Sequence, residues 1–188
     1  MLPTPTDEAL MQAYCHGDLA AFQQLYQRHQ RGLYRFLAWR SPRRDWVDEV
    51  AQDSWIALHQ ARERYQVSAS FRTFLYQIAR NRLIDLQRQP QAQPQDGADA
   101  PEGATLDAGP DLLLETRQSN AALHQAIQAL PGEQKEALVL QQFSGLSLDE
   151  IATLTAVPLE TVKSRLRYAM RKLRDHFSAG TPVREEQA

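Results

Sequence analysis

The sequence predicts an all-α protein with two small helical domains joined by a flexible linker, the second of them a helix-turn-helix. Apolar residues recur at spacings of three, four and seven on both sides of a central Pro- and Gly-rich segment, and no segment alternates as a strand would. Near the C-terminus, a short turn separates two helical patterns. With 188 residues, 43% of them hydrophobic, the chain is long enough for two such cores.

The central segment has the composition of a linker. The stretch from Gln89 to Asp111 holds four prolines and three glycines and no aromatic or basic residue, so it buries too little apolar surface to offset the entropy of ordering. Residues 89–118 carry six acidic residues against one arginine. We therefore expect domains at 1–88 and 119–178, an acidic linker at 89–118 and a tail at 179–188.

Residues 1–88 predict four helices. A short helix carries Leu10, Ala13 and Tyr14 and stops at Gly17, and Asp18 is placed to cap the next helix. Apolar stripes on the following three helices predict their buried sides. These stripes are Phe22, Leu25, Tyr26, Leu33, Phe36 and Leu37; Val47, Val50, Ala51, Ser54 and Leu58; and Phe71, Phe74, Leu75, Ile78 and Ala79.

Two of these helices also carry a polar face. Cations and an aromatic residue project together from the fourth helix, at Arg72, Tyr76, Arg80 and Arg88. Such a face is either ordinary solvated surface or a track for phosphates and unpaired bases. On the third helix, the polar face is either solvated or a surface for a basic partner. Its residues are Asp48, Glu49, Gln52 and Asp53.

The second half predicts a small bundle that ends in a helix-turn-helix. A supporting helix carries Leu123, Ala126, Ile127 and Leu130 and stops at Pro131, and another runs from Glu133 to Phe143. Ser147 and Glu150 match a capping box, Thr155 to Val157 form the turn, and Pro158 suits the first turn of the last helix. The side chains expected to face inward are Leu148, Ile151, Leu154, Val162, Leu166, Ala169, Leu173 and Phe177.

The last helix has a strongly basic outer face. Residues 163–174 hold six basic residues and no acidic one, although the whole chain has a formal net charge of -2. This charge suits a recognition helix that enters the major groove while flanking cations meet phosphates. An amphipathic helix hairpin with a solvated basic face is the alternative.

Other classes of protein find little support in the sequence. No apolar run approaches the roughly 20 residues that cross a bilayer, the start lacks a signal-peptide pattern, and the lone Cys15 cannot form an internal disulfide. We expect a protein of the cytoplasm that does not insert into a membrane. The five histidines are scattered and no HExxH, P-loop or GxSxG pattern occurs, so we expect no enzyme, cofactor, metal or small-molecule substrate.

Several segments, in order, resemble one family: the bacterial sigma-70 factors of the extracytoplasmic-function (ECF) group, which keep sigma regions two and four. The opening of region two is similar to DEALMQAYCHGDLAAFQQLYQRHQRGLYRFL, and its polymerase-binding helix to VDEVAQDSWIAL. Its promoter-reading helix is similar to SFRTFLYQIARNRLIDLQR. Region four is similar to LPGEQKEALVLQQFSGLSLDEIATLTAVPLETVKSRLRYAMRKLR. The resemblance covers nearly the whole chain outside the linker and tails.

The resemblance implies an alternative sigma-type initiation factor that binds core RNA polymerase and promoter DNA, with an anti-sigma factor as a further partner. It implies that Asp48, Glu49, Gln52 and Asp53 dock on the clamp helices of the polymerase largest subunit. For the minus-ten element, including a pocket for a flipped base, it implies Tyr65, Ser70, Phe71, Arg72, Tyr76, Arg80 and Asn81. For the minus-35 element, it implies Lys163, Ser164, Arg165, Arg167, Tyr168, Arg171 and Lys172.

Two alternatives remain open at the level of sequence. The same helix-turn-helix could serve a dimeric regulator that binds a two-fold symmetric operator without polymerase. The acidic linker could also screen the DNA-reading faces of the free protein, or be a solvated spacer only. A linker of about thirty residues has a typical span on the order of 30 Å, enough to let one chain reach two promoter elements.

Overall fold

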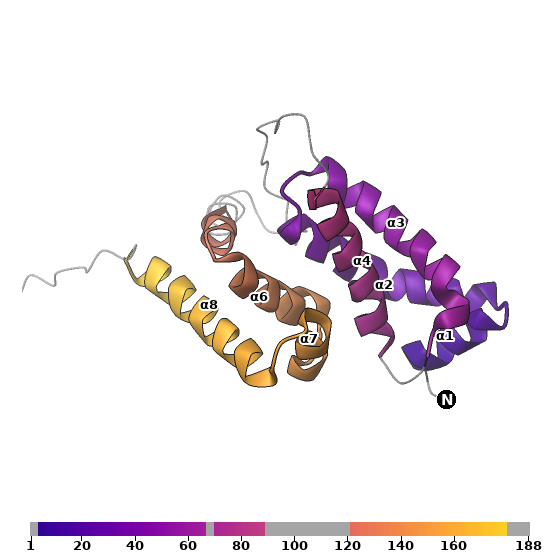
Figure 1. Ribbon diagram of the computed structural model, residues 1–188. Helices are drawn as coiled ribbons and strands as arrows, with labels where there is room; N and C mark the ends of the chain where they lie inside the picture. Colours follow the sequence, from indigo (N-terminus) through magenta and orange to yellow (C-terminus); the bar gives the residue numbers. More distant parts are fainter. Residues whose placement is uncertain (1–3, 67–69, 89–120, 180–188) are drawn as a thin grey trace, which may run out of the picture.

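The computed structural model describes residues 4–66, 70–88 and 121–179 and is helical throughout these ranges apart from short turns, which confirms the all-α prediction (Figure 1). The predicted linker at 89–118 lies outside the described residues, as does the tail beyond residue 179. A helical segment covers 121–128. The other elements are α1 (Asp7–Cys15), α2 (Leu19–Arg40), α3 (Asp45–Ala61), η1 (Arg62–Arg64), α4 (Phe71–Arg88), α6 (Gly132–Ser144), α7 (Leu148–Thr155) and α8 (Leu159–Ala179).

The boundary between α1 and α2 is set by one glycine and one carboxylate. Gly17 adopts a φ of 98°, which a residue with a Cβ rarely takes, and this ends α1. The Asp18 carboxylate then accepts hydrogen bonds from the backbone N–H groups of Ala20 (2.9 Å) and Ala21 (3.2 Å). These bonds satisfy amides that have no partner inside the helix, so the predicted N-cap is confirmed.

Helices α1 to α4 pack on one another around the predicted apolar stripes. The buried side chains include Leu25, Leu33, Phe36, Leu37, Val47, Val50, Leu58, Phe71, Leu75 and Ala79. Tyr26 is the exception, since its side chain is 40% exposed and its ring lies 5.0 Å from that of Trp55. The prediction that Tyr26 belongs to the core is therefore wrong, because its place on α2 turns it toward the edge of α3.

The helix-turn-helix forms as predicted. The Ser147 hydroxyl accepts from the Glu150 N–H at 3.2 Å, and the Glu150 carboxylate accepts from the Ser147 N–H at 2.8 Å, which completes the capping box. Ala156 then turns the chain with a φ of 55°. Ile151, Leu154, Val162, Leu166, Ala169 and Leu173 are buried and Leu148 is partly buried.

Phe177 is exposed, unlike the other residues of the apolar stripe predicted for α8. Its side chain is 41% exposed, so the prediction that it faces inward is wrong. The physical reason is the length of α8, whose last turns extend beyond the helices that cover its earlier ones (Figure 1).

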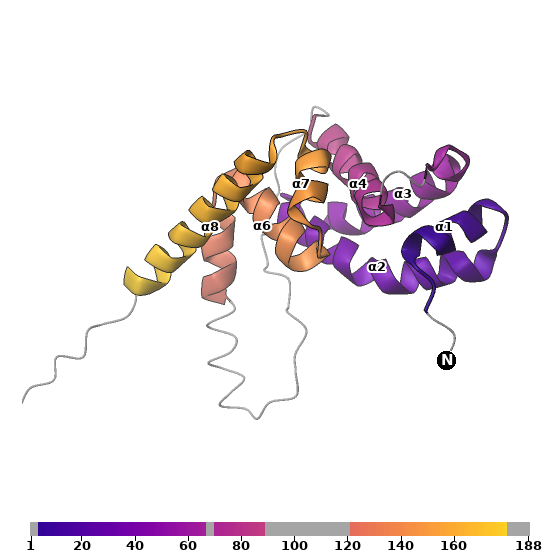
Figure 2. The same ribbon diagram turned by 90° about the horizontal axis from the view of Figure 1, so that it is seen from below.

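The C-terminal helices lie directly against the N-terminal ones. Helix α6 packs on α2, and α7 packs on α4, so the buried side chains of the two groups form one continuous cluster (Figure 2). The Trp39 ring of α2 stacks on the Phe143 ring of α6, with centroids 5.3 Å apart and planes at 16°. Two helical units were predicted, but nothing in the sequence indicated that they would share an interface.

A buried histidine fastens α1 to α2. The His29 Nε2 donates to Asp7 Oδ2 at 2.7 Å, and its ring lies 5.1 Å from that of Phe71. Burial lowers the pKa of His29 below its ordinary value, and the nearby Asp7 carboxylate offsets only part of this. Burial tends to raise the pKa of Asp7, but the bonds from Arg28 and His29 outweigh it and lower the pKa.

We expect His29 to make folding stability depend on pH. Because its pKa is lower in the folded than in the unfolded chain, the unfolded chain takes up the proton first as pH falls below about 6.5, and the free energy of unfolding decreases. Urea unfolding at about pH 7.5 and about pH 5.5 should show a smaller pH-dependent loss in His29→Gln than in the parent. His16→Gln, which replaces an exposed histidine, is the matched control. An equal pH-dependent loss in all three proteins would contradict this assignment.

Candidate functional site

The acidic face of α3 is open to solvent. Asp48, Glu49 and Gln52 are exposed and Asp53 is partly buried, while Val47, Val50, Ser54 and Leu58 on the other side are buried. Positions three and four apart fall on one side of a helix, so the polar residues form a single surface. The structure thus brings together all four residues predicted to contact polymerase.

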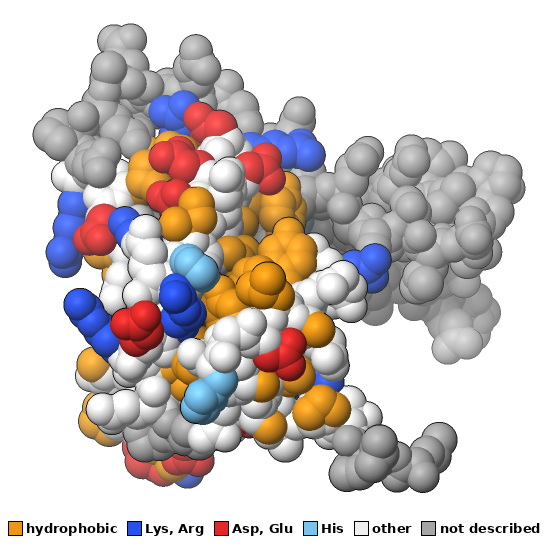
Figure 3. All heavy atoms as spheres, turned by 90° about the vertical axis from the view of Figure 1, so that its right-hand side faces the viewer, with side chains coloured by type: hydrophobic (Ala, Val, Ile, Leu, Met, Phe, Trp, Pro, Cys, Tyr) orange, Lys and Arg blue, Asp and Glu red, His pale blue; other side chains and the backbone are white. Residues whose placement is uncertain are grey.

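An exposed apolar patch adjoins this acidic face. Ile56, 46% exposed, follows Gln52 by four residues and Asp53 by three, which places it on the same side of α3. Tyr26 of α2 is also exposed, and its ring lies 5.0 Å from that of Trp55, the residue next to Ile56 on α3. Figure 3 shows apolar side chains across the middle of this side of the molecule, with acidic ones gathered above them. Ile56 is not among the residues predicted for this surface, although its position outside the apolar stripe of α3 is a signal of exposure that the sequence carries.

The predicted minus-ten face of α4 is only partly covered, since Arg72 and Asn81 are exposed and Tyr76 is not. Tyr76 is only 1% exposed, and its ring meets that of Phe36 edge-on at a centroid distance of 5.3 Å. The prediction that Tyr76 projects from an outer surface is therefore wrong for this arrangement. The reason is that α6 and α7 pack over α2 and α4, which the sequence did not indicate.

Arginines of the N-terminal helices bind oxygens of the C-terminal ones at this contact. The Nε of Arg80 donates to Glu136 Oε1 at 3.0 Å, and Arg40 Nη2 lies 3.4 Å from the same oxygen. The Arg72 Nη1 donates to the carbonyl oxygen of Gly145 at 3.0 Å. Glu136 is only 6% exposed, so water does little to stabilise its negative charge. The guanidinium groups of Arg40 and Arg80 compensate that charge instead.

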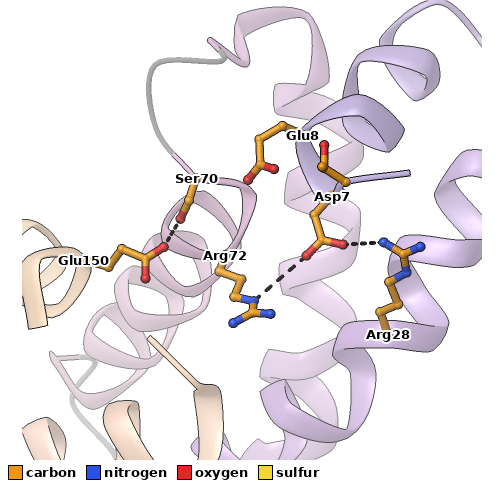
Figure 4. A pocket seen from close by; sticks show the side chains of 7 residues that line it. Asp7, Glu8, Arg28, Ser70, Arg72 and Glu150 are labelled. Carbon is orange, nitrogen blue, oxygen red and sulfur yellow. Dashed lines mark hydrogen bonds and ion pairs between the residues drawn. The ribbon is translucent and has the colours of Figure 1, made fainter. Parts of the chain in front are cut away.

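A pocket of about 340 Å³ lies where α1, α2, α4 and α7 meet, and Ser70 and Arg72 of the predicted minus-ten set line it (Figure 4). Its charged groups are largely paired with one another. Arg28 donates to Asp7 at 2.8 Å, Ser70 donates to Glu150, and Glu8 accepts from the Phe71 N–H at 3.0 Å. These contacts join the start of α4 to both α1 and α7.

The residues predicted for a flipped-base pocket are only partly brought together. Ser70 and Phe71 are adjacent, but Phe71 is fully buried. The Tyr65 ring packs 5.3 Å from Phe74, and burial raises the pKa of Tyr65 to about 12. Asn81 is exposed, accepts from Gln77 at 2.9 Å, and lies about 15 Å along α4 from Phe71. Since residues 67–69 are outside the described ranges, the full lining of this pocket stays a prediction.

The basic face of α8 is largely open to solvent. Lys163, Arg167, Tyr168, Arg171 and Lys172 are exposed. Arg171 lies over the Tyr168 ring at 4.9 Å, an attraction between a cation and a π system. The Ser164 hydroxyl, by contrast, is partly buried and donates to the Thr161 carbonyl at 2.9 Å.

Arg165 differs from the other cations of α8. Its side chain is 17% exposed and its Nη2 lies 2.7 Å from Glu133 Oε2 of α6. It lies on the edge of α8 opposite to Arg167, since residues two apart on a helix do not share a face. The structure therefore separates Arg165 from the open part of the predicted minus-35 surface.

No cluster of three or more His, Cys, Asp or Glu side chains suited to a metal ion is found within residues 4–66, 70–88 and 121–179. In the same ranges, no helix is both long and apolar enough to span a membrane.

Two sequence families match the two halves of the chain. Residues 25–92 match Sigma-70 region 2, and residues 120–173 match Sigma-70 region 4. The ECF RNA polymerase sigma factor RpoE of Cereibacter sphaeroides is 37% identical over 175 residues, which cover 90% of this chain and 94% of that protein. The ECF RNA polymerase sigma-E factor of Escherichia coli K12 is 29% identical over 173 residues, covering 86% of this chain and 88% of its own length.

Solved structures share the fold. CnrH, in a complex with the cytosolic domain of CnrY, aligns with a TM-score of 0.70 at 23% identity over 93% of this chain and 99% of its own. The sigma factor RpoE of Bartonella quintana, in a complex with the anti-sigma factor NepR, aligns with a TM-score of 0.65 at 19% identity over 85% of this chain and 98% of its own. With both regions matched and its relatives covered almost end to end, the chain belongs to the ECF group of the sigma-70 family and is an alternative sigma factor that directs RNA polymerase to promoters.

Proposed function

We propose that this sigma factor divides its work among three surfaces: the face of α3 docks on core RNA polymerase, the face of α4 reads the single-stranded minus-ten element, and the face of α8 reads the minus-35 duplex. The observation that carries this division is that the acidic face of α3 and the basic face of α8 are both exposed, one on an N-terminal helix and the other on a C-terminal helix. Opposite charges at separate sites fit two different partners.

The α3 surface combines the features of a docking site. Its carboxylates attract a basic coiled coil and set its register, while the adjacent apolar side chains of Ile56 and Tyr26 exclude water on contact. Charges of this kind guide encounter more than they add affinity, so the apolar patch supplies much of the binding free energy.

The α8 surface suits duplex DNA. A row of exposed cations neutralises phosphates, and Arg167 and Tyr168 lie in the first half of the helix, the part that reaches base edges in a helix-turn-helix. On α4, Arg72 and Arg80 offer guanidinium groups for phosphates and Tyr76 a ring for stacking on an unpaired base. Tyr76 and Arg80 become available only when the C-terminal helices move away from them.

Three further features belong to this proposal. The chain acts in the cytoplasm beside the polymerase, contributes no catalytic group of its own, and is held inactive by an anti-sigma factor. The last feature is supported by CnrH and the Bartonella RpoE, which were each solved bound to another protein, NepR being named an anti-sigma factor. Domains at 1–88 and 119–178 with a linker at 89–118 remain part of the proposal.

Reconstitution with bacterial core polymerase tests the function as a whole. Core enzyme plus this chain should give run-off transcripts from a subset of a random promoter library, and sequencing these should reveal two separated elements. A dimeric operator-binding regulator would instead retain a two-fold symmetric duplex without polymerase and give no transcripts. That result would overturn the proposal.

Two substitutions on α3 should distinguish a charge that speeds association with core polymerase from an apolar side chain that slows dissociation. Glu49→Lys should slow association with core polymerase, most strongly at low salt, because it replaces an attraction by a repulsion. Ile56→Ser should speed dissociation and cost about 1 kcal/mol, roughly fivefold in affinity. Both rates can be followed by surface plasmon resonance on immobilised core enzyme. Tyr34→Ser, which removes an exposed aromatic elsewhere on α2, is the control. Unchanged kinetics in both α3 variants would rule out docking through this face.

Two arginines of α8 should differ in their effect on duplex binding. Arg167→Gln should weaken binding of a selected minus-35 duplex by about 1–3 kcal/mol and lower the slope of log affinity against log salt by about one. Arg165→Gln should lose less affinity, because Arg165 is already paired with Glu133. Fluorescence anisotropy over a salt series measures both effects. Equal losses would mean that Arg165 exchanges Glu133 for a phosphate.

A further inference from the structure

We propose that α6 and α7 form an intramolecular cover over α4: in the free protein, Glu136 latches this cover closed, and the minus-ten strand can bind only after the latch opens. The proposal rests on the function proposed above for the α4 face. It is distinct from screening by the acidic linker, since the covering residues belong to α6 and α7.

Glu136 is the centre of the latch. It lies on α6 yet its carboxylate is bonded to Arg80 of α4 and lies beside Arg40 of α2. A buried carboxylate is costly without partners, and both of these partners come from the other group of helices. Glu136 is therefore compensated in the closed arrangement and is free to return to water when the helices separate.

The contacts that hold the cover closed use side chains that the minus-ten strand would otherwise bind. Carboxylate and phosphate oxygens bind guanidinium groups in the same way, so Glu136 holds Arg80 in the place of a phosphate. The carbonyl oxygen of Gly145 engages Arg72 in the same manner, and the Glu150 carboxylate engages Ser70. Tyr76 is buried beneath them. Ser70, Arg72 and Arg80 are thus each bound by the C-terminal helices, whereas Asn81 stays exposed and bonds to Gln77 of α4 itself.

The cover leaves the other two proposed binding surfaces open to solvent. The acidic face of α3 and the basic face of α8 stay exposed in the closed arrangement. Polymerase docking through α3 and duplex binding through α8 therefore do not require opening, whereas binding of the single strand does. This order couples minus-ten reading to prior capture of the chain by the polymerase.

The helices pack closely around Gly32, and some buried polar atoms at the contact between the two groups of helices lack hydrogen-bond partners. A Cβ added at Gly32 of α2 would lie 2.9 Å from the Tyr76 hydroxyl oxygen and 3.5 Å from the Phe143 carbonyl oxygen. Within the described residues, the buried Arg40 Nε and His124 Nε2 have no hydrogen-bond partner. Unpaired buried polar atoms weaken a contact, which suits one that must open.

Two variants open the latch by different physical routes. Glu136→Gln removes the charge that Arg40 and Arg80 share, with almost no change in shape. Gly32→Ala inserts a methyl group 2.9 Å from the Tyr76 hydroxyl, whose hydrogen-bond partner Ser144 belongs to α6, so it pushes Tyr76 against the cover without changing any charge. Alanine also favours helix α2 more than glycine does. Asp149→Asn is the matched control, because it removes one carboxylate from an exposed position of α7.

The test uses full-length protein in which Cys15→Ser removes the native thiol. A dye pair is attached at Gln23→Cys on α2 and Ser178→Cys on α8, so that energy transfer reports the distance between these two helices. Binding is measured by anisotropy with a random-sequence single-stranded oligonucleotide pool and with a random-sequence duplex pool. Glu136→Gln and Gly32→Ala should both lower energy transfer. Each should tighten single-strand binding about tenfold relative to duplex binding, as for a chain that is otherwise open about a tenth of the time. Asp149→Asn should behave as the parent.

Unchanged energy transfer in both opening variants would overturn the latch. Lower energy transfer without tighter single-strand binding would overturn the masking of α4. A separate experiment, run-off transcription by holoenzyme, tests the function proposed for α4. If holoenzyme that contains the Arg80→Ala chain transcribed as well as holoenzyme with the parent chain, the α4 face would not read the minus-ten element.

Discussion

The arrangement of the whole chain depends on how the buried charge of Glu136 is compensated. A carboxylate taken out of water needs positive partners, and the ones it finds on α2 and α4 fix α6 against the N-terminal helices. The stacked rings of Trp39 and Phe143 and the close approach at Gly32 add directional packing around it. The apolar cores alone would not set this orientation, because burial of apolar surface has no direction.

This contact leaves three faces of the fold unequally exposed. The acidic face of α3 and the basic face of α8 remain in solvent, where charge attracts a partner over several ångströms before any contact is made. On α4, Arg72 and Arg80 instead bind oxygens of the C-terminal helices, and Tyr76 is buried. In the division of work proposed above, the docking and duplex-reading faces are therefore open, while part of the single-strand face is covered.

Helices α3 and α8 also differ in what positions them. Helix α3 packs through buried side chains along one side, so its acidic face is turned to solvent. The short α7 begins at a capping box and is followed by the left-handed turn at Ala156, after which α8 begins. Local backbone chemistry thus sets where α8 begins, and core packing sets which face of α3 is exposed.

The sequence by itself determined the helices, their caps and their apolar sides, because helix periodicity and capping act within a few residues of the chain. It also determined the acidic face of α3, the basic face of α8 and the family. Only the tertiary structure decided that Tyr76 is buried, that Arg165 turns to Glu133, that Asn81 lies far from Phe71, and that Ile56 joins the acidic face as an exposed apolar contact. These outcomes depend on which helices meet across the fold, and contacts between residues distant in sequence leave no periodic signal in either helix.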